Sequence, residues 1–326
     1  MTVRVLALCG GIGGAKLALG LYRVLPPDTL TVAVNTGDDF EHLGLHISPD
    51  VDTVLYTLAC LNNPETGWGR ADETWSFMAA LEELGGETWF QLGDGDLALH
   101  VERTWRLRDG MGLGTVTEDV RRRLGIAARV LPMSDDPVRT VVETEDGRLP
   151  FQHYFVKLRC EPRVTGFVYE GADRARPQPE VMALLADPTL DAVVICPSNP
   201  FLSIDPILAM PGLRAAMAAC PAPVVAVSPI VGRDSVKGPL GKILRELDLP
   251  TSSATVADHY AGLLDGLIVD RRDAGDRAGI AVPTRVAETL MRSLEDREAL
   301  AKTVLDFAAD LRAAKVPPPR LAEAGR

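Results

Sequence analysis

The chain has 326 residues, of which 46% are hydrophobic and 24% are charged, a composition that excludes a disordered or fibrous protein. Its 34 basic against 45 acidic residues give a net charge of −11, which argues against general binding to nucleic acid or to an anionic membrane. No apolar run is long enough to span a bilayer, and the five scattered cysteines are expected to be buried free thiols in a reducing cytoplasm.

The first segment predicts the opening of a doubly wound α/β sheet. Residues 3–9 form an apolar run interrupted only by Arg4, residues 16–25 have helical spacing, and residues 30–35 (LTVAVN) form a second, mostly apolar run. A buried strand, a helix and another buried strand in this order are typical of a Rossmann-like, mostly parallel sheet. Further helices are expected at residues 50–61, 72–84, 96–108 and 115–124.

The hydrophobic period changes between residue 128 and about residue 167, where Asp146-Gly147 between strand-like flanks predicts a hairpin. The α/β pattern then resumes with strands at 192–196, 224–227 and 267–269, helices at 204–219, 240–247, 255–264 and 287–311, and a loose tail at 315–326. We therefore predict a Rossmann-like nucleotide-binding core made of residues 1–60 and 176–326, with a smaller α+β insertion at residues 61–175.

A glycine-rich turn follows the first predicted strand. It contains Gly10, Gly11, Gly13 and Gly14 and is followed by Lys16. Glycines at this place let backbone N–H groups approach a phosphate at a helix N-terminus. The pattern lacks the last glycine and the serine or threonine of a P-loop, and it is not a full dinucleotide fingerprint. We expect a phosphate or diphosphate site here, and a tight turn without a ligand is the alternative.

The segment after the second predicted strand holds four aspartates, Asp38, Asp39, Asp50 and Asp52. Carboxylates near a phosphate-binding turn suit Mg²⁺, which takes one or two of them and leaves its other positions to phosphates and water. Asp50 is the best candidate for a helix cap. Asp39 and Asp52 are predicted to function as a catalytic base or as Mg²⁺ ligands, and the sequence leaves that choice open.

Two further polar loops follow buried strands. Ser198, Asn199 and Pro200 follow one strand, and Ser228 follows the next, so their side chains are expected at the ligand-binding edge of the sheet. Lys237 and Lys242 could meet phosphates, or they could be solvated surface lysines. Asp94 precedes a predicted helix, where capping is the alternative to a functional role.

Seven motifs occur together and in order between about residues 3 and 270: GGIGGAKL, VNTGDDFEHLGLHISPDVDTVLYTL, GWGRADETW, LGDGDLALH, LPMSDDPV, PSNPFLSI and SPIVG. In combination they resemble the 2-phospho-L-lactate transferase family (CofD/FbiA), which makes the deazaflavin coenzyme F-420. The resemblance implies transfer of a phosphorylated three-carbon acid from a guanosine diphosphate-linked donor to the ribityl hydroxyl of the deazaflavin Fo, with release of GMP and a requirement for Mg²⁺. The acid, 2-phospholactate, phosphoenolpyruvate or 3-phosphoglycerate, is left open.

The resemblance also assigns residues. It implies that Gly10 to Gly14 lie near the donor phosphates, that Asp39 and Asp52 lie at the metal and the acceptor, and that PSNP and SPIVG lie on the guanine side. Gln91, Asp94 and Asp52 are the implied deazaflavin contacts, and the insertion is expected to cover that site. Two departures stand out, because Gln91 replaces a basic residue of some relatives and Gly95 replaces the arginine of the usual LGDRD. The family also suggests a homodimer, for which residues 287–311 are a candidate surface and core packing is the alternative.

Two other functions compete with this interpretation. The gluconeogenesis-factor proteins (YvcK-like), which bind nucleotide-sugars and have a regulatory role, share the glycine-rich opening and the NP loop. The PDVDTVLYTL and LGD-x-D-LA-x-H stretches favour the transferase. An NAD(P) oxidoreductase is disfavoured, because the GxGxxG pattern is broken and no hydride-transfer constellation is present.

Overall fold

A sheet of seven parallel strands forms the centre of the computed structural model, which describes residues 3–236 and 238–315. The strand order is β12-β11-β10-β9-β1-β2-β5. These strands are β1 (Val5–Cys9), β2 (Leu30–Val34), β5 (Arg129–Pro132), β9 (Ala192–Ile195), β10 (Val224–Val227), β11 (Gly266–Asp270) and β12 (Thr284–Ala287). This order confirms the predicted doubly wound, Rossmann-like α/β fold.

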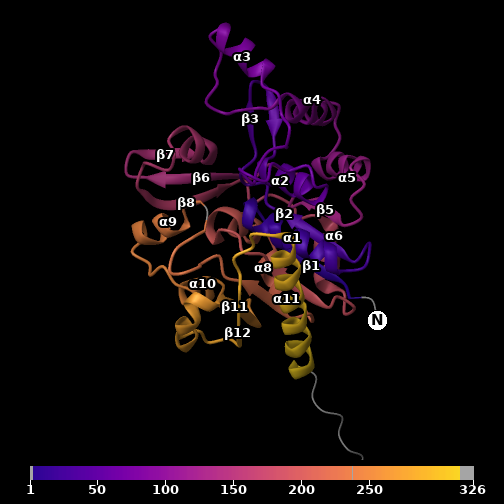
Figure 1. Cartoon of the computed structure of the whole chain (residues 1–326), viewed down its shortest axis with the longest axis vertical. Coiled ribbons are helices and arrows are strands. Elements are labelled where there is room, and N and C mark those ends of the chain that lie inside the picture. The colour runs from indigo at the N-terminus through magenta and orange to yellow at the C-terminus, as the bar shows by residue number, and fades with distance from the viewer. Residues whose placement is uncertain (1–2, 237, 316–326) are drawn as a thin grey trace, which may run out of the picture.

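Helices cover both faces of this sheet (Figure 1). Alternate residues of β1 enter different cores: Val5 and Ala7 pack on one face, Leu6 and Leu8 on the other. One face carries α1 (Gly11–Val24), α2 (Pro49–Leu58), α5 (Leu113–Arg123) and α11 (Leu294–Lys315). The other carries α6 (Pro179–Ala186), α7 (Asp205–Leu208), α8 (Leu213–Ala218), α9 (Leu240–Glu246) and α10 (Ser253–His259). Two buried faces explain why the central strands β1, β9 and β10 are apolar throughout.

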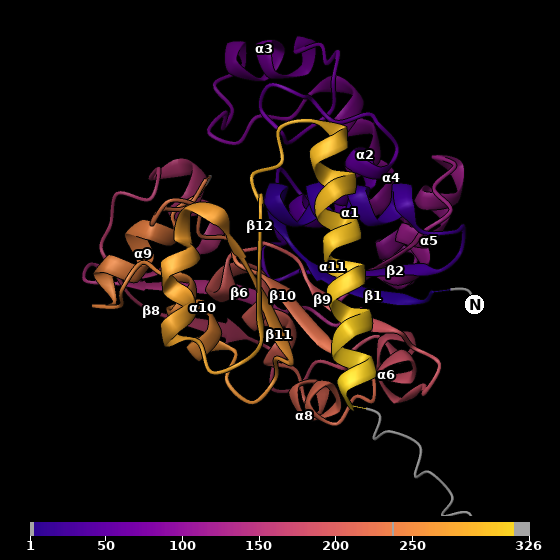
Figure 2. The same ribbon diagram turned by 60° about the horizontal axis from the view of Figure 1, so that its bottom comes forward.

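Helix α11 lies along α1 over much of its length (Figure 2). The two backbones meet at Gly20, where a side chain would overlap the carbonyl oxygen of Arg297. Leu300, Val304 and Phe307 of α11 are buried in the core of the chain itself. Core packing, the alternative prediction for residues 287–311, therefore accounts for the apolar residues of this segment.

Two smaller units stand at the edge of the sheet where its strands end. The first combines the hairpin β3 (Phe40–His42) and β4 (Leu45–Ile47) with α3 (Ser76–Glu83) and α4 (Asp94–Arg108). The second is the antiparallel sheet β7-β6-β8, formed by β6 (Arg139–Thr144), β7 (Gly147–Pro150) and β8 (Val164–Glu170), which contains the predicted hairpin. Short helical turns at His153–Lys157, Pro200–Ile204 and Arg271–Gly279 complete the chain.

Several element boundaries differ from the prediction. Helix α1 begins at Gly11 rather than at residue 16, so the glycine-rich turn is itself the first helical turn. The predicted helix 287–311 begins only at Leu294, because residues 284–287 pair with β11 and Asp270 holds the backbone N–H of Thr289. Strand β5 joins the central sheet although it falls within residues 61–175.

Other expectations concern single residues and the chain end. All five cysteines are free, but Cys60 is exposed and Cys160 half-buried, so only three fit the expected buried thiols. Lys237 and residues 316–326 of the predicted tail lie outside the described residues. No helix in the described ranges is long and apolar enough to cross a membrane.

Candidate active site

A cavity of about 730 Å³ opens at the carboxyl ends of the strands. Its walls include the turns after β1, β9 and β10, the start of α2, and segments of both smaller units. Chain connections run in opposite directions from β1 and β9, and ligands of open α/β sheets bind at such a switch point. The volume lies within the range of about 300–1,000 Å³ that small-molecule sites occupy.

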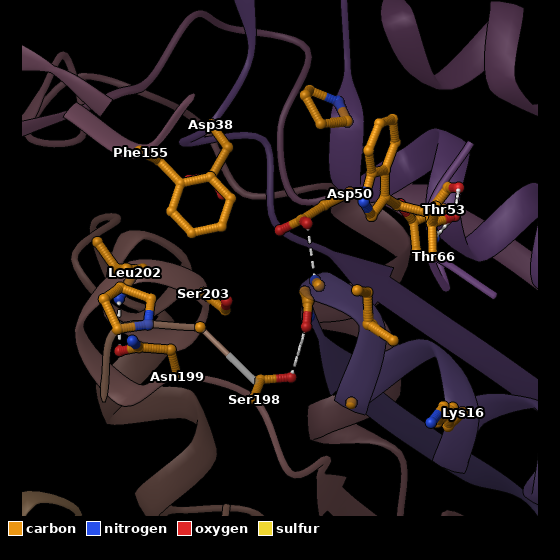
Figure 3. Close-up of a pocket in the computed structure, with 18 of the residues that line it drawn as sticks. Lys16, Asp38, Asp50, Thr53, Thr66, Phe155, Ser198, Asn199, Leu202 and Ser203 are labelled. Carbon is orange, nitrogen blue, oxygen red and sulfur yellow. Dashed lines mark hydrogen bonds between the residues drawn. The ribbon is translucent and has the colours of Figure 1, made fainter. Parts of the chain in front are cut away.

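The glycine-rich turn forms the floor of this cavity. The Gly11 N–H donates a hydrogen bond to Asp50 Oδ1 (2.7 Å), and the Ser198 hydroxyl both accepts from Gly10 N–H (3.2 Å) and donates to its carbonyl (2.8 Å). Figure 3 shows Asp50 and Ser198 joined to this turn from opposite sides. The N–H groups of the first turn of a helix have no acceptor within it, so Ile12 and Gly13 offer donors to an anion.

Carboxylates crowd the cavity beside this turn. Burial raises the pKa of Asp50 from 3.8 to about 6, against the lowering effect of hydrogen bonds from Asn35 and Gly11. Burial also raises the pKa of Asp38 well above its usual value, and the Asp50 charge adds to the rise. Within the described chain, Asp38 Oδ1 and Asp39 Oδ1 are buried without a hydrogen-bond partner. Such a cluster favours a bound cation.

Asp52 belongs to a second, different network. Both of its oxygens accept hydrogen bonds from Arg103 of α4, and His100 Nδ1 lies 3.7 Å from Asp52 Oδ2. His100 Nε2 lies 3.2 Å from Asp96 Oδ2, and the Tyr56 hydroxyl donates to Asp96 Oδ1 (2.6 Å). Burial raises the pKa of Asp52, and the charge of Arg103 works against this rise.

The spacing of Asp52, Asp96 and His100 would also suit a metal ion, since one ligand atom of each lies within 4.8 Å of the others. The guanidinium of Arg103 already neutralises Asp52 from both oxygens. A second cation at this place would therefore meet a buried positive charge.

Aromatic side chains form another wall. Tyr56, Trp89 and Phe90 line the cavity, and Trp68 and Phe155 stand at it with 49% and 40% of their surface exposed. Exposed aromatic rings beside a cavity are typical of a site that takes a flat, largely apolar ligand.

Most of the predicted site residues line this cavity. They are Gly10, Gly11, Gly13, Lys16, Asp52, Gln91, Ser198, Asn199 and Ser228. Asn199 also caps the following turn by accepting from the N–H groups of Phe201 and Leu202, and the Ser228 hydroxyl pairs with that of Ser253 (2.9 Å). Lys16 Nζ donates to the Met291 carbonyl (3.1 Å).

Four predicted site residues do not line it. Asp39 lies behind the wall, where its Oδ2 accepts from the Ser48 hydroxyl (2.8 Å) and meets His46 Nε2 (3.1 Å). Gly14 packs against Ser198 and Cys9 too closely for any side chain, and Pro200 is buried in the next turn.

Asp94 is the fourth of these residues, and its role is to cap a helix. It accepts hydrogen bonds from the Thr74 hydroxyl and from the N–H groups of Ser76 and Phe77 at the start of α3. These bonds, that of Thr74 first, lower the pKa of Asp94. For Lys242 the sequence left open a phosphate contact or a solvated surface position. In the structure its Nζ pairs with Glu246 (2.6 Å), and the residue does not line the cavity.

The sequence predicts no functional role for Asp38, which lines the cavity, or for Asp50, which accepts the N–H of Gly11. It also predicts none for the supporting residues Asp96, His100 and Arg103. Positions 96, 100 and 103 share one face of α4, a spacing that could have revealed an inward-facing polar stripe. Gly95 is the position at which the sequence departs from the LGDRD pattern. A Cβ atom added there would lie 3.0 Å from Glu73 Oε1 and 3.4 Å from Arg70 Nε. A basic group from the GWGR motif thus lies beside Gly95.

Asp50 gives the metal-free protein a pH-dependent stability. Because its folded pKa of about 6 exceeds the 3.8 of an ordinary aspartate, the folded chain binds this proton more tightly than the unfolded chain does. Its contribution is thus fully present below about pH 4 and is lost as the pH rises through about 6. We therefore compare the free energy of unfolding of Asp50→Asn with that of the natural chain at pH 4 and at pH 7. Between these pH values the difference should shift by about 2–3 kcal/mol in favour of the variant. Urea unfolding with a chelator present measures this, and an equal difference at both pH values would contradict it.

Comparison with known proteins identifies close relatives. The sequence model of one family, described as 2-phospho-L-lactate transferase CofD, matches residues 5–303. The phosphoenolpyruvate transferase of Streptomyces griseus subsp. griseus is 43% identical over 322 residues, which cover 95% of this chain and 100% of that protein. The 2-phospho-L-lactate transferase of Methanopyrus kandleri is 42% identical over 316 residues, which cover 95% and 99%.

Solved structures show the same fold at a greater distance. Protein BH3568 of Bacillus halodurans, described as a member of the upf0052 family, is similar with a TM-score of 0.64 over 94% of this chain and 100% of that one. At 16% sequence identity, this likeness concerns the fold alone.

Proposed function

Because the chain belongs to the 2-phospho-L-lactate transferase (CofD) family, we propose that it moves a phosphorylated three-carbon acid from a guanosine diphosphate-linked donor to the ribityl hydroxyl of Fo. GMP is the leaving group, and the product is the precursor form of coenzyme F-420. One observation carries the proposal beyond the family name. An anion-binding helix start, a cluster of carboxylates and an aromatic wall border one cavity.

The three features match the parts of the two substrates. The N–H groups at Ile12 and Gly13 bind the diphosphate at the start of α1. Ser198, Asn199 and Ser228 contribute polar groups for the guanosine side. The aromatic wall with Trp68, Trp89 and Phe155 stacks on the deazaflavin ring system, and Gln91 borders the same region.

Mg²⁺ fits the carboxylate cluster. The unpartnered buried oxygens of Asp38 and Asp39, and the raised pKa of Asp38 and Asp50, are what an oxygen site for a divalent cation would relieve. Asp38 and Asp50, which line the cavity, would hold the ion. Of the pair that the sequence predicts, Asp39 does not line the cavity, and both oxygens of Asp52 are held by Arg103. When bound, Mg²⁺ supplies positive charge to the diphosphate oxygens.

Asp52 acts on the acceptor. The ribityl oxygen attacks the phosphorus that carries the acid, a new O–P bond forms, and the bond from that phosphorus to the oxygen of GMP breaks. The hydroxyl proton passes to the Asp52 carboxylate, whose raised pKa suits it to hold a proton. Arg103 fixes the direction of this carboxylate by donating hydrogen bonds to both of its oxygens.

The transferred acid stays open among 2-phospholactate, phosphoenolpyruvate and 3-phosphoglycerate. Relatives named for two different acids are 43% and 42% identical to this chain, a difference too small to decide between them. A homodimer, expected from the family, also stays a prediction, and light scattering on the purified protein tests it.

The nucleotide-sugar-binding alternative has less support. The family model and the relatives with 42–43% identity are transferases by name, whereas the likeness to protein BH3568 is one of fold. A nucleotide-sugar that raises the melting temperature of the protein more than GDP does would favour the alternative.

Removal of the metal is expected to stop the reaction. With Fo and a reactive donor present, chelation by EDTA should lower GMP release by at least about 100-fold, because the diphosphate loses the positive charge that offsets the developing negative charge. Added Mg²⁺ should restore it, whereas Asp38→Asn should need far more Mg²⁺ for the same rate. GMP release measured by chromatography tests the proposal, and full activity in EDTA would contradict the metal's role.

A further inference from the structure

A second, smaller cavity of about 60 Å³ lies next to the main one. It is bounded by α1, by the loop at residues 62–67 and by the start of α11. Ile12 and Lys16 line both cavities, so the small one lies directly beside the turn that binds phosphate. One water needs only about 10–15 Å³ of such space, so the small cavity has room for a carboxylate-sized group.

Three of the side chains that line this small cavity are basic: Lys16, Arg292 and Arg297. None of its lining residues in the described chain is acidic. The Arg297 Nε is buried without a hydrogen-bond partner among the described residues, and burial lowers the pKa of this guanidinium. Asp296, the neighbouring carboxylate, is bonded to the backbone N–H groups of Arg292 and Ser293. The cavity therefore presents basic groups without a lining carboxylate.

These features match one part of the proposed donor. Its diphosphate is assigned to the helix start, and each of the three possible acids carries a carboxylate a few bonds beyond the phosphorus that is transferred. We propose that the small cavity binds the carboxylate of the transferred three-carbon acid through Arg297 and Arg292. The inference rests on the proposed function and adds that the chain recognises the feature common to all three acids.

Binding of two ligands separates this site from the phosphate site. GDP lacks the acid, whereas the donor, GDP-linked phosphoenolpyruvate or 2-phospholactate, contains it, and without Fo the donor is not consumed. Calorimetry measures both dissociation constants for the natural chain, Arg297→Gln and Arg292→Gln. We expect Arg297→Gln to weaken donor binding at least tenfold while GDP binding changes less than twofold, because a charge-assisted pair with the carboxylate is lost. Arg292→Gln, at an exposed position, should act in the same direction with a smaller effect.

Arg23→Gln is the matched control, since Arg23 also lies between α1 and α11 but pairs with Glu298 (3.9 Å) outside both cavities. Unchanged GDP binding by each variant shows that it is folded. Equal effects on donor and GDP, or no effect of Arg297→Gln on either, would overturn the carboxylate site. Inorganic phosphate is also added to the natural chain while the donor is bound. If phosphate binds then and Arg297→Gln abolishes that binding, the small cavity is a separate anion site, and the carboxylate site is overturned. A natural chain that binds no donor and transfers nothing would overturn the proposed function itself.

Discussion

Asp52→Asn is expected to lower kcat/KM for transfer to Fo by about 100- to 10,000-fold, the range that a lost general base produces. The amide keeps the size of the side chain but cannot take the hydroxyl proton. Asp52 lines the cavity and has its carboxylate held by Arg103 from α4, so its position is set by the fold rather than by the ligand. Steady-state GMP release at saturating donor and varied Fo measures the effect.

Asp94→Asn is the control for this variant. Asp94 lies near the same end of the protein, but it caps α3 and does not line the cavity. Its transfer rate should stay within about threefold of the natural chain, since a lost cap costs about 1 kcal/mol of stability and nothing at the reacting atoms. Asp52→Asn with the natural turnover, in a folded protein, would remove Asp52 from the mechanism.

Arg103→Met should have the largest effect on stability, a loss of about 3–5 kcal/mol in the free energy of unfolding. Arg103 is 2% exposed and Asp52 is 5% exposed, so removing the guanidinium leaves a buried carboxylate without its cation. Arg108→Met on the same helix is the control, because Arg108 is exposed and bonds only the Gly44 carbonyl among the described residues. It should change stability by less than about 1 kcal/mol.

The double variant Asp52→Asn/Arg103→Met tests whether the loss comes from the broken pair. If the unpaired charge is the cause, removing it as well restores part of the stability, with a coupling of at least about 1 kcal/mol. Urea unfolding of the four proteins provides the cycle. Strictly additive effects would show that Arg103 stabilises the chain by packing alone.

The fold followed from the sequence because its strands are buried on both faces. Residues 192–196 are apolar throughout and residues 30–34 are apolar except for Thr31, and the glycines and prolines that follow them mark the edge where ligands bind. Strand β12 was missed because all four of its residues are only partly buried and it lies at the sheet edge, where the apolar pattern is weak. The sequence pattern predicts no strand at the hairpin β3–β4, whose tight turn is formed by Leu43 and Gly44 at positive φ.

The site could be predicted only in part, for a different physical reason. The sequence predicts a helix cap at Asp50, and the family resemblance implies a deazaflavin contact at Asp94. In the structure Asp94 caps α3, which begins 18 residues earlier in the chain, while Asp50 bonds Gly11 on another element. Local sequence shows that an aspartate precedes a helix, but not which N–H group it reaches. The pairing of Asp52 with Arg103 spans 51 residues and depends on how α4 docks against α2.

The most direct test of the proposed reaction is a transfer assay that identifies the product by mass. Purified protein is incubated with Fo, Mg²⁺ and each of the three guanosine diphosphate-linked donors in turn, and mass spectrometry follows GMP and the phosphodiester of Fo. We predict that at least one donor gives GMP and the Fo product in equal amounts, and the productive donor then identifies the transferred acid. A folded protein that forms no Fo product from any of the three donors would contradict the account.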